Sequence, residues 1–340
     1  MKYDVFFYEA FKEEEEALRR YLPGGLRAGF TWRAIQEAGD REPPAAVISV
    51  RTQSVLPVEW AGKLRGIVTR STGYEHVVEY LRETGAGIAC GYLPLYCNRA
   101  VAEQALLMWL ALLRKLRQQM AQLPRFERDG ITGAECAGAR LAVFGVGNIG
   151  YEVVRIGRGL DMEVVGVDIV KRHRDVRYVS REEGLRWAEV IVCAMNLTKE
   201  NEGYFAHGVL REARRGVIFV NVARGEFSPP VELLELLDEG QLGGVGLDVY
   251  PNEKQMAAAM RCGAGEGELD EQARAVLELA RRPNAIVTPH NAFNTREAVE
   301  RKARQAIEQV EEFRARGRFK GPVPLGVGGT GGAVGDGGED

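Results

Sequence analysis

Apolar residues form short runs that alternate with segments of helical spacing along most of the chain. In the first part, the strand-like runs cover residues 3–9, 45–51, 66–71 and 87–92. The helix-like segments cover 11–22 and 74–85, and the first carries Glu and Arg four residues apart, as expected for a solvated helix face. Strands that alternate with helices are typical of a parallel sheet covered on both faces.

A long apolar helix-like segment at 99–120 follows, and the alternation then starts again after a polar stretch at 124–139. The later strand-like runs are RLAVFGVG, EVVGVDIV, VIVCAM, GVIFVNVA, GGVGLDVY and NAIVTPH. The segment 251–284 is longer and more polar than a simple loop, and we expect its residues 261–270 to be exposed. The pattern predicts an α/β protein with two Rossmann-like, doubly wound parallel-sheet domains.

Composition narrows the class of protein. The 340 residues suffice for two domains, and 45% apolar with 27% charged residues is ordinary for a soluble globular protein. A net charge of −3 gives no reason to expect nucleic acid or a membrane surface as a partner. The five cysteines are scattered without metal-ligand spacing, so we expect no metal and a reducing, cytoplasmic location. No signal peptide or membrane-spanning segment is predicted.

The strongest local motif is a glycine loop. It lies between an apolar strand and a helix-like segment and consists of Gly145, Gly147, Asn148, Ile149 and Gly150. The glycines allow a tight turn and a close approach of the backbone to a pyrophosphate, and the helix N-terminus supplies amide donors. The context predicts a dinucleotide site rather than a structural turn.

Asp168 ends the next strand, about 20 residues downstream, and would accept hydrogen bonds from the adenosine ribose. Its charge would repel a 2′-phosphate, which favours NAD over NADP. Lys171, Arg172 and Arg174 lie just beyond it and could hold that phosphate, so the alternative stays open.

Four polar side chains stand at or just after later strand ends: Arg224, Asp248, Glu253 and His290. The carboxyl ends of parallel strands are where ligands bind in open α/β sheets. An arginine there can hold a carboxylate through two hydrogen bonds, and a glutamate beside a histidine stabilises the imidazolium. A lone histidine after a strand is more often structural. A chemical role for His290 is therefore indicated only by the other polar residues at neighbouring strand ends.

These motifs together carry a family resemblance. The ordered set GVGNIG with Asp168, NVARGE, LDVYPNE and TPHNAF resembles the D-isomer-specific 2-hydroxyacid dehydrogenases, from residue 70 to about residue 315. The resemblance implies a substrate domain of residues 1–97 plus 292–325 and an NAD-binding domain of residues 98–291, with an active-site cleft between them. Residues 326–340 are predicted to form a disordered Gly-rich tail. The resemblance also implies a homodimer, to whose interface the helix at 99–120 contributes.

The resemblance assigns roles to the catalytic and cofactor residues. Arg224 would bind the substrate carboxylate, and His290 would exchange a proton with the substrate oxygen. Glu253 would hydrogen-bond His290 and keep it protonated, and Asp248 would face the nicotinamide carboxamide.

The substrate residues follow from the same resemblance. The backbone around Thr72 and Gly73 would contact the carboxylate, and Tyr96 and Phe293 would line the pocket. The Ala-Phe pair after His290 resembles the D-lactate dehydrogenase branch, which makes D-lactate and pyruvate the first expected substrate pair. A branched 2-oxo acid, hydroxypyruvate or glyoxylate is the alternative, and so is an NADH-sensing protein similar to the family's corepressors. Ala194 and Asn196 depart from the family pattern near the expected cofactor.

Overall fold

The computed structural model describes residues 2–263 and 265–324, and the predicted tail at 326–340 lies outside them. The chain divides into two compact units. Unit 1 contains the residues up to Tyr96 and those from Glu300 on, and unit 2 is Cys97–Val299. These limits differ from the predicted domain boundaries at 97/98 and 291/292, and the assignment of substrate and cofactor to separate domains stays a prediction.

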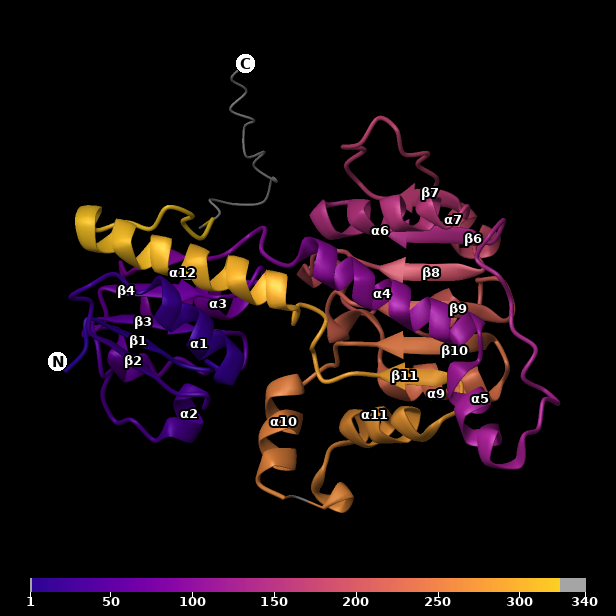
Figure 1. Cartoon of the computed structure of the whole chain (residues 1–340), viewed down its shortest axis with the longest axis horizontal. Coiled ribbons are helices and arrows are strands. Elements are labelled where there is room, and N and C mark those ends of the chain that lie inside the picture. The colour runs from indigo at the N-terminus through magenta and orange to yellow at the C-terminus, as the bar shows by residue number, and fades with distance from the viewer. Residues whose placement is uncertain (1, 264, 325–340) are drawn as a thin grey trace. The chain divides into compact units, whose positions relative to one another are not determined.

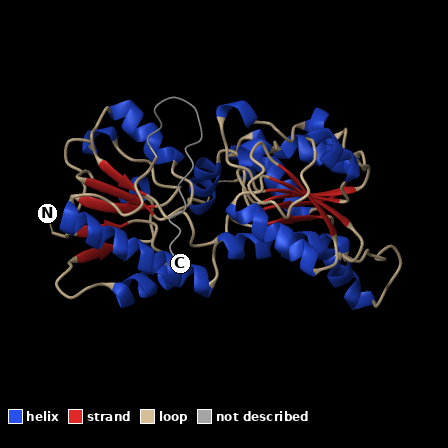
Figure 2. Cartoon of the chain, turned by 90° about the horizontal axis from the view of Figure 1, so that it is seen from above, coloured by secondary structure: helices blue, strands red, loops and turns tan. Residues whose placement is uncertain are grey.

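Unit 1 is built on a five-stranded parallel sheet in the order β2-β1-β3-β4-β5. Its strands are β1 (Val5–Phe7), β2 (Ala28–Phe30), β3 (Val47–Val50), β4 (Gly66–Thr69) and β5 (Ala89–Gly91). Its helices are α1 (Lys12–Tyr21), α2 (Ile35–Ala38), α3 (Glu75–Thr84) and most of α12 (Arg296–Arg316). Helices lie on both faces of this sheet (Figure 2), which explains why the inner strands are apolar runs without alternation.

Unit 2 is built on a six-stranded parallel sheet in the order β11-β10-β9-β8-β6-β7 (Figure 1). Its strands are β6 (Arg140–Phe144), β7 (Glu163–Val167), β8 (Val190–Cys193), β9 (Val217–Asn221), β10 (Leu242–Leu247) and β11 (Ala285–Val287). Its helices are α4 (Asn98–Leu113), α5 (Leu116–Gln122), α6 (Asn148–Gly159), α7 (Arg181–Trp187), α8 (His207–Leu210), α9 (Pro230–Asp238), α10 (Glu253–Arg261) and α11 (Glu271–Arg281). Helices again cover both faces (Figure 2), so the predicted class of two doubly wound parallel sheets is confirmed.

The structure corrects the predicted long helix at 99–120. α4 ends at Leu113, Lys115 takes a left-handed φ of +51°, and α5 begins at Leu116. The carbonyl of Leu113 accepts a hydrogen bond from the amide of Ala134 at 2.9 Å instead of continuing the helix ladder. The break therefore results from a tertiary contact with the stretch before β6.

Several further elements were not predicted, among them β2, α2, α7, α10 and α11. β2 and α2 contain only three and four residues, which is too short for a periodic pattern. Of the described residues in 261–270, only Leu269 is buried, so the expected exposure of this stretch is otherwise confirmed.

A buried ion triad of Glu14, Arg70 and Lys302 links three elements of unit 1. Glu14 Oε1 lies 2.8 Å from Arg70 Nε and 2.9 Å from Lys302 Nζ, and all three side chains are fully buried. Burial raises the pKa of Glu14, but the cations Lys302, Arg70 and Arg51 outweigh it and hold the pKa at about 2. Burial lowers the pKa of Lys302 to about 7 despite the attraction of Glu14.

The triad makes stability depend on pH in a testable way. Lysine in the unfolded chain titrates near 10.5, so between about pH 7 and 10.5 the unfolded state binds the proton more tightly than the folded state. Lys302 therefore costs stability near neutral pH, and that cost diminishes as the pH rises through this window.

Lys302→Met removes this titration and leaves Glu14 and Arg70 as a balanced pair. We expect the urea midpoint of the wild-type protein to rise relative to that of the variant between about pH 7 and 9.5. An unchanged difference would contradict the assignment.

Candidate active site

The glycine loop connects β6 to α6 at the carboxyl edge of the unit 2 sheet. Gly145 has a φ of +84°, and a Cβ there would lie 2.6 Å from the Cα of Met195. A Cβ at Gly150 would lie 1.8 Å from the carbonyl oxygen of Gly145. At Gly147, in contrast, a Cβ would meet no atom within 4 Å, so this part of the loop backbone is open to a ligand. The loop, with Asn148 and Ile149 in the first turn of α6, fits a dinucleotide pyrophosphate.

Asp168 follows β7 and is fixed beside this loop. Its Oδ2 accepts a hydrogen bond from the amide of Val146 at 2.6 Å, and its Oδ1 accepts one from Val170 at 2.9 Å. The carboxylate is thus held beside the glycine loop, and its contact with the adenosine ribose stays a prediction. Lys171, Arg172 and Arg174 are exposed in the next segment.

The segment after Asp168 is anchored to α6. The ring of His173 stacks on that of Tyr151 with centroids 3.8 Å apart and planes 5° apart. Asp175 accepts hydrogen bonds from the Tyr151 hydroxyl at 3.1 Å and from Arg158 Nη1 at 2.6 Å. Farther along, the amide of Val179 donates to Gly166 at 2.9 Å and adds a bridge to the outer edge of β7. These contacts hold the outer border of the predicted cofactor site.

His290 and Glu253 form a side-chain pair beyond β11 and β10. The Nδ1 of His290 lies 2.8 Å from Oε2 and 3.0 Å from Oε1 of Glu253. Both side chains are partly exposed, at 26% and 21%. The carboxylate accepts a hydrogen bond from Nδ1–H, which selects the orientation of the ring and leaves Nε2 as the nitrogen that can exchange a proton with a substrate.

Asp248 anchors the turn that carries His290. Its Oδ1 accepts hydrogen bonds from the Thr288 hydroxyl at 2.5 Å and from the amide of Asn291 at 2.8 Å. Its Oδ2 accepts one from the amide of Ala292 at 2.8 Å. Burial raises the pKa of Asp248, against the lowering effect of these hydrogen bonds. The contacts of the carboxylate are therefore with the turn, and its predicted role toward the nicotinamide stays a prediction.

The same turn holds His290 in an unusual backbone conformation. His290 has a φ of +49°, in the left-handed region, and its amide donates to the carbonyl of Thr288 at 2.9 Å. The hydroxyl of Tyr250 donates to the same carbonyl. Such a conformation costs free energy and persists because the surrounding hydrogen bonds determine the turn.

Arg224 follows β9, the strand next to β10, and is half-buried. The buried side chain of Asn221 donates to the carbonyl of Arg224 at 2.8 Å and accepts from the amide of Ala223 at 3.0 Å. A Cβ at Gly225 would lie 1.8 Å from the backbone carbon of Tyr250. Only glycine therefore lets the Arg224 turn pack against the segment that joins Asp248 to Glu253.

The predicted substrate residues divide between the two units. Phe293 belongs to unit 2, where its largely buried ring lies 6.5 Å from that of His290 between centroids. Thr72, Gly73 and Tyr96 belong to unit 1. The carbonyl of Gly73 accepts a hydrogen bond from the Ser71 hydroxyl at 2.6 Å, and Tyr96 is buried. The catalytic and cofactor candidates thus converge within unit 2 alone.

Sequence reasoning missed three residues that shape this site: Asn221, Gly225 and Thr288. Asn221 and Thr288 are polar residues at the carboxyl ends of apolar strands, and that position was the available signal. Gly225 gave no signal, because its role depends on a backbone that is distant in the sequence.

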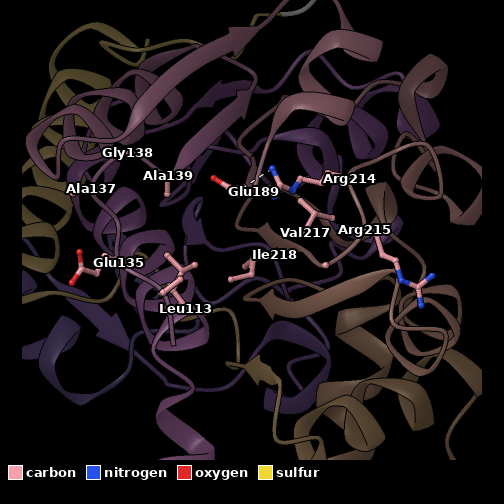
Figure 3. A pocket seen from close by; sticks show the side chains of 12 residues that line it. Leu113, Glu135, Ala137, Gly138, Ala139, Glu189, Arg214, Arg215, Val217 and Ile218 are labelled. Carbon is pink, nitrogen blue, oxygen red and sulfur yellow. Dashed lines mark ion pairs between the residues drawn. The ribbon is translucent and has the colours of Figure 1, made fainter. Parts of the chain in front are cut away.

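A cavity of about 560 Å³ lies elsewhere in unit 2 (Figure 3). It is lined by residues that precede or begin β6, β8 and β9, among them Ala139, Glu189 and Val217. It contains no predicted site residue. Ligands of parallel sheets bind at the carboxyl edge, so this cavity at the amino edge is not the candidate active site.

Comparison with known proteins connects this geometry to a family. Residues 106–292, more than half of the chain, match the model described as "D-isomer specific 2-hydroxyacid dehydrogenase, NAD binding domain". An aromatic 2-oxoacid reductase of Clostridium sporogenes is 27% identical over 76% of this chain and 78% of its own. A D-lactate dehydrogenase of Streptococcus agalactiae is 29% identical over 89% and 93%.

Similarity extends to solved structures. The D-lactate dehydrogenase of Aquifex aeolicus, solved with NAD and lactic acid, superposes with a TM-score of 0.80 at 27% identity. The match covers 95% of this chain and all of that one. Within the described residues, no helix is long and apolar enough to cross a membrane.

Proposed function

We propose that this chain, which belongs to the D-isomer-specific 2-hydroxyacid dehydrogenase family and is an NAD-dependent dehydrogenase, interconverts a small 2-oxo acid and its D-2-hydroxy acid, with pyruvate and D-lactate as the preferred pair. The observation that carries the proposal is the His290–Glu253 pair beside the Arg224 turn, on the carboxyl edge of the sheet that holds the glycine loop. In the proposed reaction, Arg224 acts as the anion clamp and His290 as the proton donor, beside the predicted nucleotide site.

Each residue of the set has a definite task in the proposed reaction. Bound NADH supplies a hydride to the keto carbon. Arg224 holds the substrate carboxylate, and the Nε2–H of His290 gives its proton to the keto oxygen, which leaves the imidazole neutral. Glu253 stays a carboxylate that holds Nδ1–H and stabilises the imidazolium before transfer. In the reverse direction, Nε2 takes the proton from the hydroxyl.

Two features favour a small substrate. The ring of Phe293 stands edge-on to His290 at 6.5 Å between centroids and limits the room beside the reacting group. The resemblance to the D-lactate dehydrogenase branch points the same way, but a similar chain is named an aromatic 2-oxoacid reductase. The substrate ranking is therefore part of the proposal.

A substrate panel tests the proposed function. Pyruvate, hydroxypyruvate, glyoxylate, 4-methyl-2-oxopentanoate and phenylpyruvate are mixed with the protein and NADH or NADPH, and nicotinamide absorbance is followed. We expect the highest kcat/KM with pyruvate and NADH. A higher value with phenylpyruvate would overturn the substrate choice. Tight NADH binding without turnover of any acid would overturn the enzymatic function and favour an NADH-sensing protein.

The catalytic pair is tested with a matched control. His290→Ala removes the proton donor, and Glu253→Gln keeps a hydrogen-bonding side chain but removes its charge. We expect kcat to fall by about 10²–10⁴-fold in the first variant, and by a smaller factor in the second, with NADH affinity retained. His207 is the control, because it is similarly exposed at 29% and lies 3.7 Å from a glutamate, Glu239. An unchanged kcat in His290→Ala, or an equal loss in His207→Ala, would remove His290 from the mechanism.

A homodimer is the second part of the proposal. Six large apolar side chains are exposed along α4, α5, the 3-10 helix Leu123–Arg125 and the residue that follows it: Leu107, Leu110, Leu116, Met120, Leu123 and Phe126. Exposed apolar side chains on consecutive elements support an interaction surface there. Sedimentation should give a dimer for the wild-type chain and a shift toward monomer for Met120→Glu. A wild-type monomer at micromolar concentration would contradict it.

A further inference from the structure

The Glu14–Arg70–Lys302 triad lies at the carboxyl edge of the unit 1 sheet. Arg70 directly follows β4, and its guanidinium donates to Ser49 Oγ on β3 at 2.8 Å and to the carbonyl of Tyr8, just after β1, at 2.6 Å. In this sheet β2 lies on one side of β1 and β3 on the other, so the order in which strands are added reverses between β1 and β3. Such a switch point is where doubly wound sheets bind ligands. The triad therefore lies beneath the expected ligand edge of unit 1.

Arg70 fixes the start of the turn that is predicted to bind the substrate carboxylate. The next residues are Ser71, Thr72 and Gly73. Three guanidinium nitrogens of Arg70 have separate partners, because Nε donates to Glu14 at 2.8 Å while Nη1 and Nη2 hold β3 and the end of β1. The backbone of this turn thus leaves the sheet from a position set by three elements.

Lys302 lies next to Tyr96, another predicted substrate residue. Its Nζ lies 5.7 Å from the centroid of the Tyr96 ring and 5.1 Å from that of Phe11. The preceding residue of α12, Arg301, donates from Nε to the carbonyl of Tyr96 at 2.9 Å. Consecutive residues of one helix therefore contact both the ring and the backbone of Tyr96.

Stability alone gives a weak reason for this triad. Taking charges out of water costs free energy for each ion, and apolar side chains of similar volume often stabilise a protein as well or better. A buried charge cluster does impose a fixed geometry, because each partner is costly to leave unpaired. Its position next to two sets of predicted substrate contacts connects that geometry to function.

We propose that the buried triad positions the substrate-binding residues of unit 1: Arg70 sets the Ser71–Gly73 turn, and Lys302 holds the ring of Tyr96. The proposal rests on the proposed function, because Thr72, Gly73 and Tyr96 are substrate residues only in that context. Arg70 and Lys302 are positioning residues, since both side chains are fully buried and act through their neighbours.

The test uses Lys302→Met in the full-length protein. The variant keeps an unbranched stem and leaves the Glu14–Arg70 pair intact, so we expect it to fold. We expect KM for pyruvate to rise about tenfold, with kcat within about threefold of wild type and the Kd of NADH unchanged, because the contact with Tyr96 bears on substrate position. Arg304→Met is the matched control on the same helix, where Arg304 is 58% exposed and lies 3.9 Å from Glu308.

A double-mutant cycle separates positioning from a general structural role. If Lys302 acts through Tyr96, the KM of Lys302→Met/Tyr96→Ala equals that of Tyr96→Ala alone. Additive effects on KM, or a wild-type KM in Lys302→Met, would overturn the proposal. A variant that lowers kcat and NADH affinity together would also overturn it, since that result indicates general loss of structure.

A binding measurement keeps the two proposals distinguishable. Calorimetry of oxamate, an unreactive analogue of pyruvate, is performed with the NADH complexes of wild type and Lys302→Met. Weaker oxamate binding in the variant supports positioning even if turnover is too slow to measure. Equal oxamate binding by both proteins rejects the positioning role but does not contradict the dehydrogenase function. A wild-type protein that neither binds oxamate nor reduces any 2-oxo acid rejects the function itself.

Discussion

The arrangement of the site depends on one constraint, which is that parallel strands bring all their carboxyl ends to the same edge of a sheet. β9, β10 and β11 are adjacent in unit 2, and the residues that follow them are Arg224, Asp248 and Glu253, and His290. Side chains separated by as many as 66 positions in the sequence therefore become neighbours without a dedicated interaction to gather them. The same constraint puts the glycine loop after β6 on that edge, at the switch point between β6 and β8.

Strand order alone does not determine how a side chain is oriented. The orientation also depends on buried hydrogen bonds that fix the turns after the strands. Asn221 fixes the turn of Arg224, and Asp248 fixes the turn of His290 through the hydroxyl of Thr288 and two backbone amides. Asp248 is 1% exposed, so its carboxylate is costly to bury and is held by three donors. Because those donors all belong to residues 288–292, the cost of burying Asp248 is offset only when His290 is in place.

The sequence was sufficient for the features that depend on local pattern. Apolar runs between polar helices predicted both parallel sheets, and polar residues at strand ends predicted the Arg224, Glu253 and His290 set, whose catalytic roles stay predictions. The break between α4 and α5 could not be predicted, because the carbonyl of Leu113 is taken by Ala134 from a distant stretch. The triad was equally hidden, since Glu14 lies in a charged run of α1 that resembles a solvated face, and only the fold buries it against Arg70 and Lys302.

Asp248 and Glu14, two of the buried carboxylates, show two ways of holding a turn at the edge of a sheet. Asp248 accepts hydrogen bonds from neutral donors, and burial raises its pKa. Glu14 lies among cations, which lower its pKa to about 2 even though burial opposes them. Neutral donors on one short segment make Asp248 specific for that segment, the turn of His290. The charges around Glu14 instead come from α12 and from the end of β4, so a single carboxylate couples elements that are far apart in the chain. That difference explains why the triad can position two separate groups, the Ser71–Gly73 turn and Tyr96, whereas Asp248 positions one.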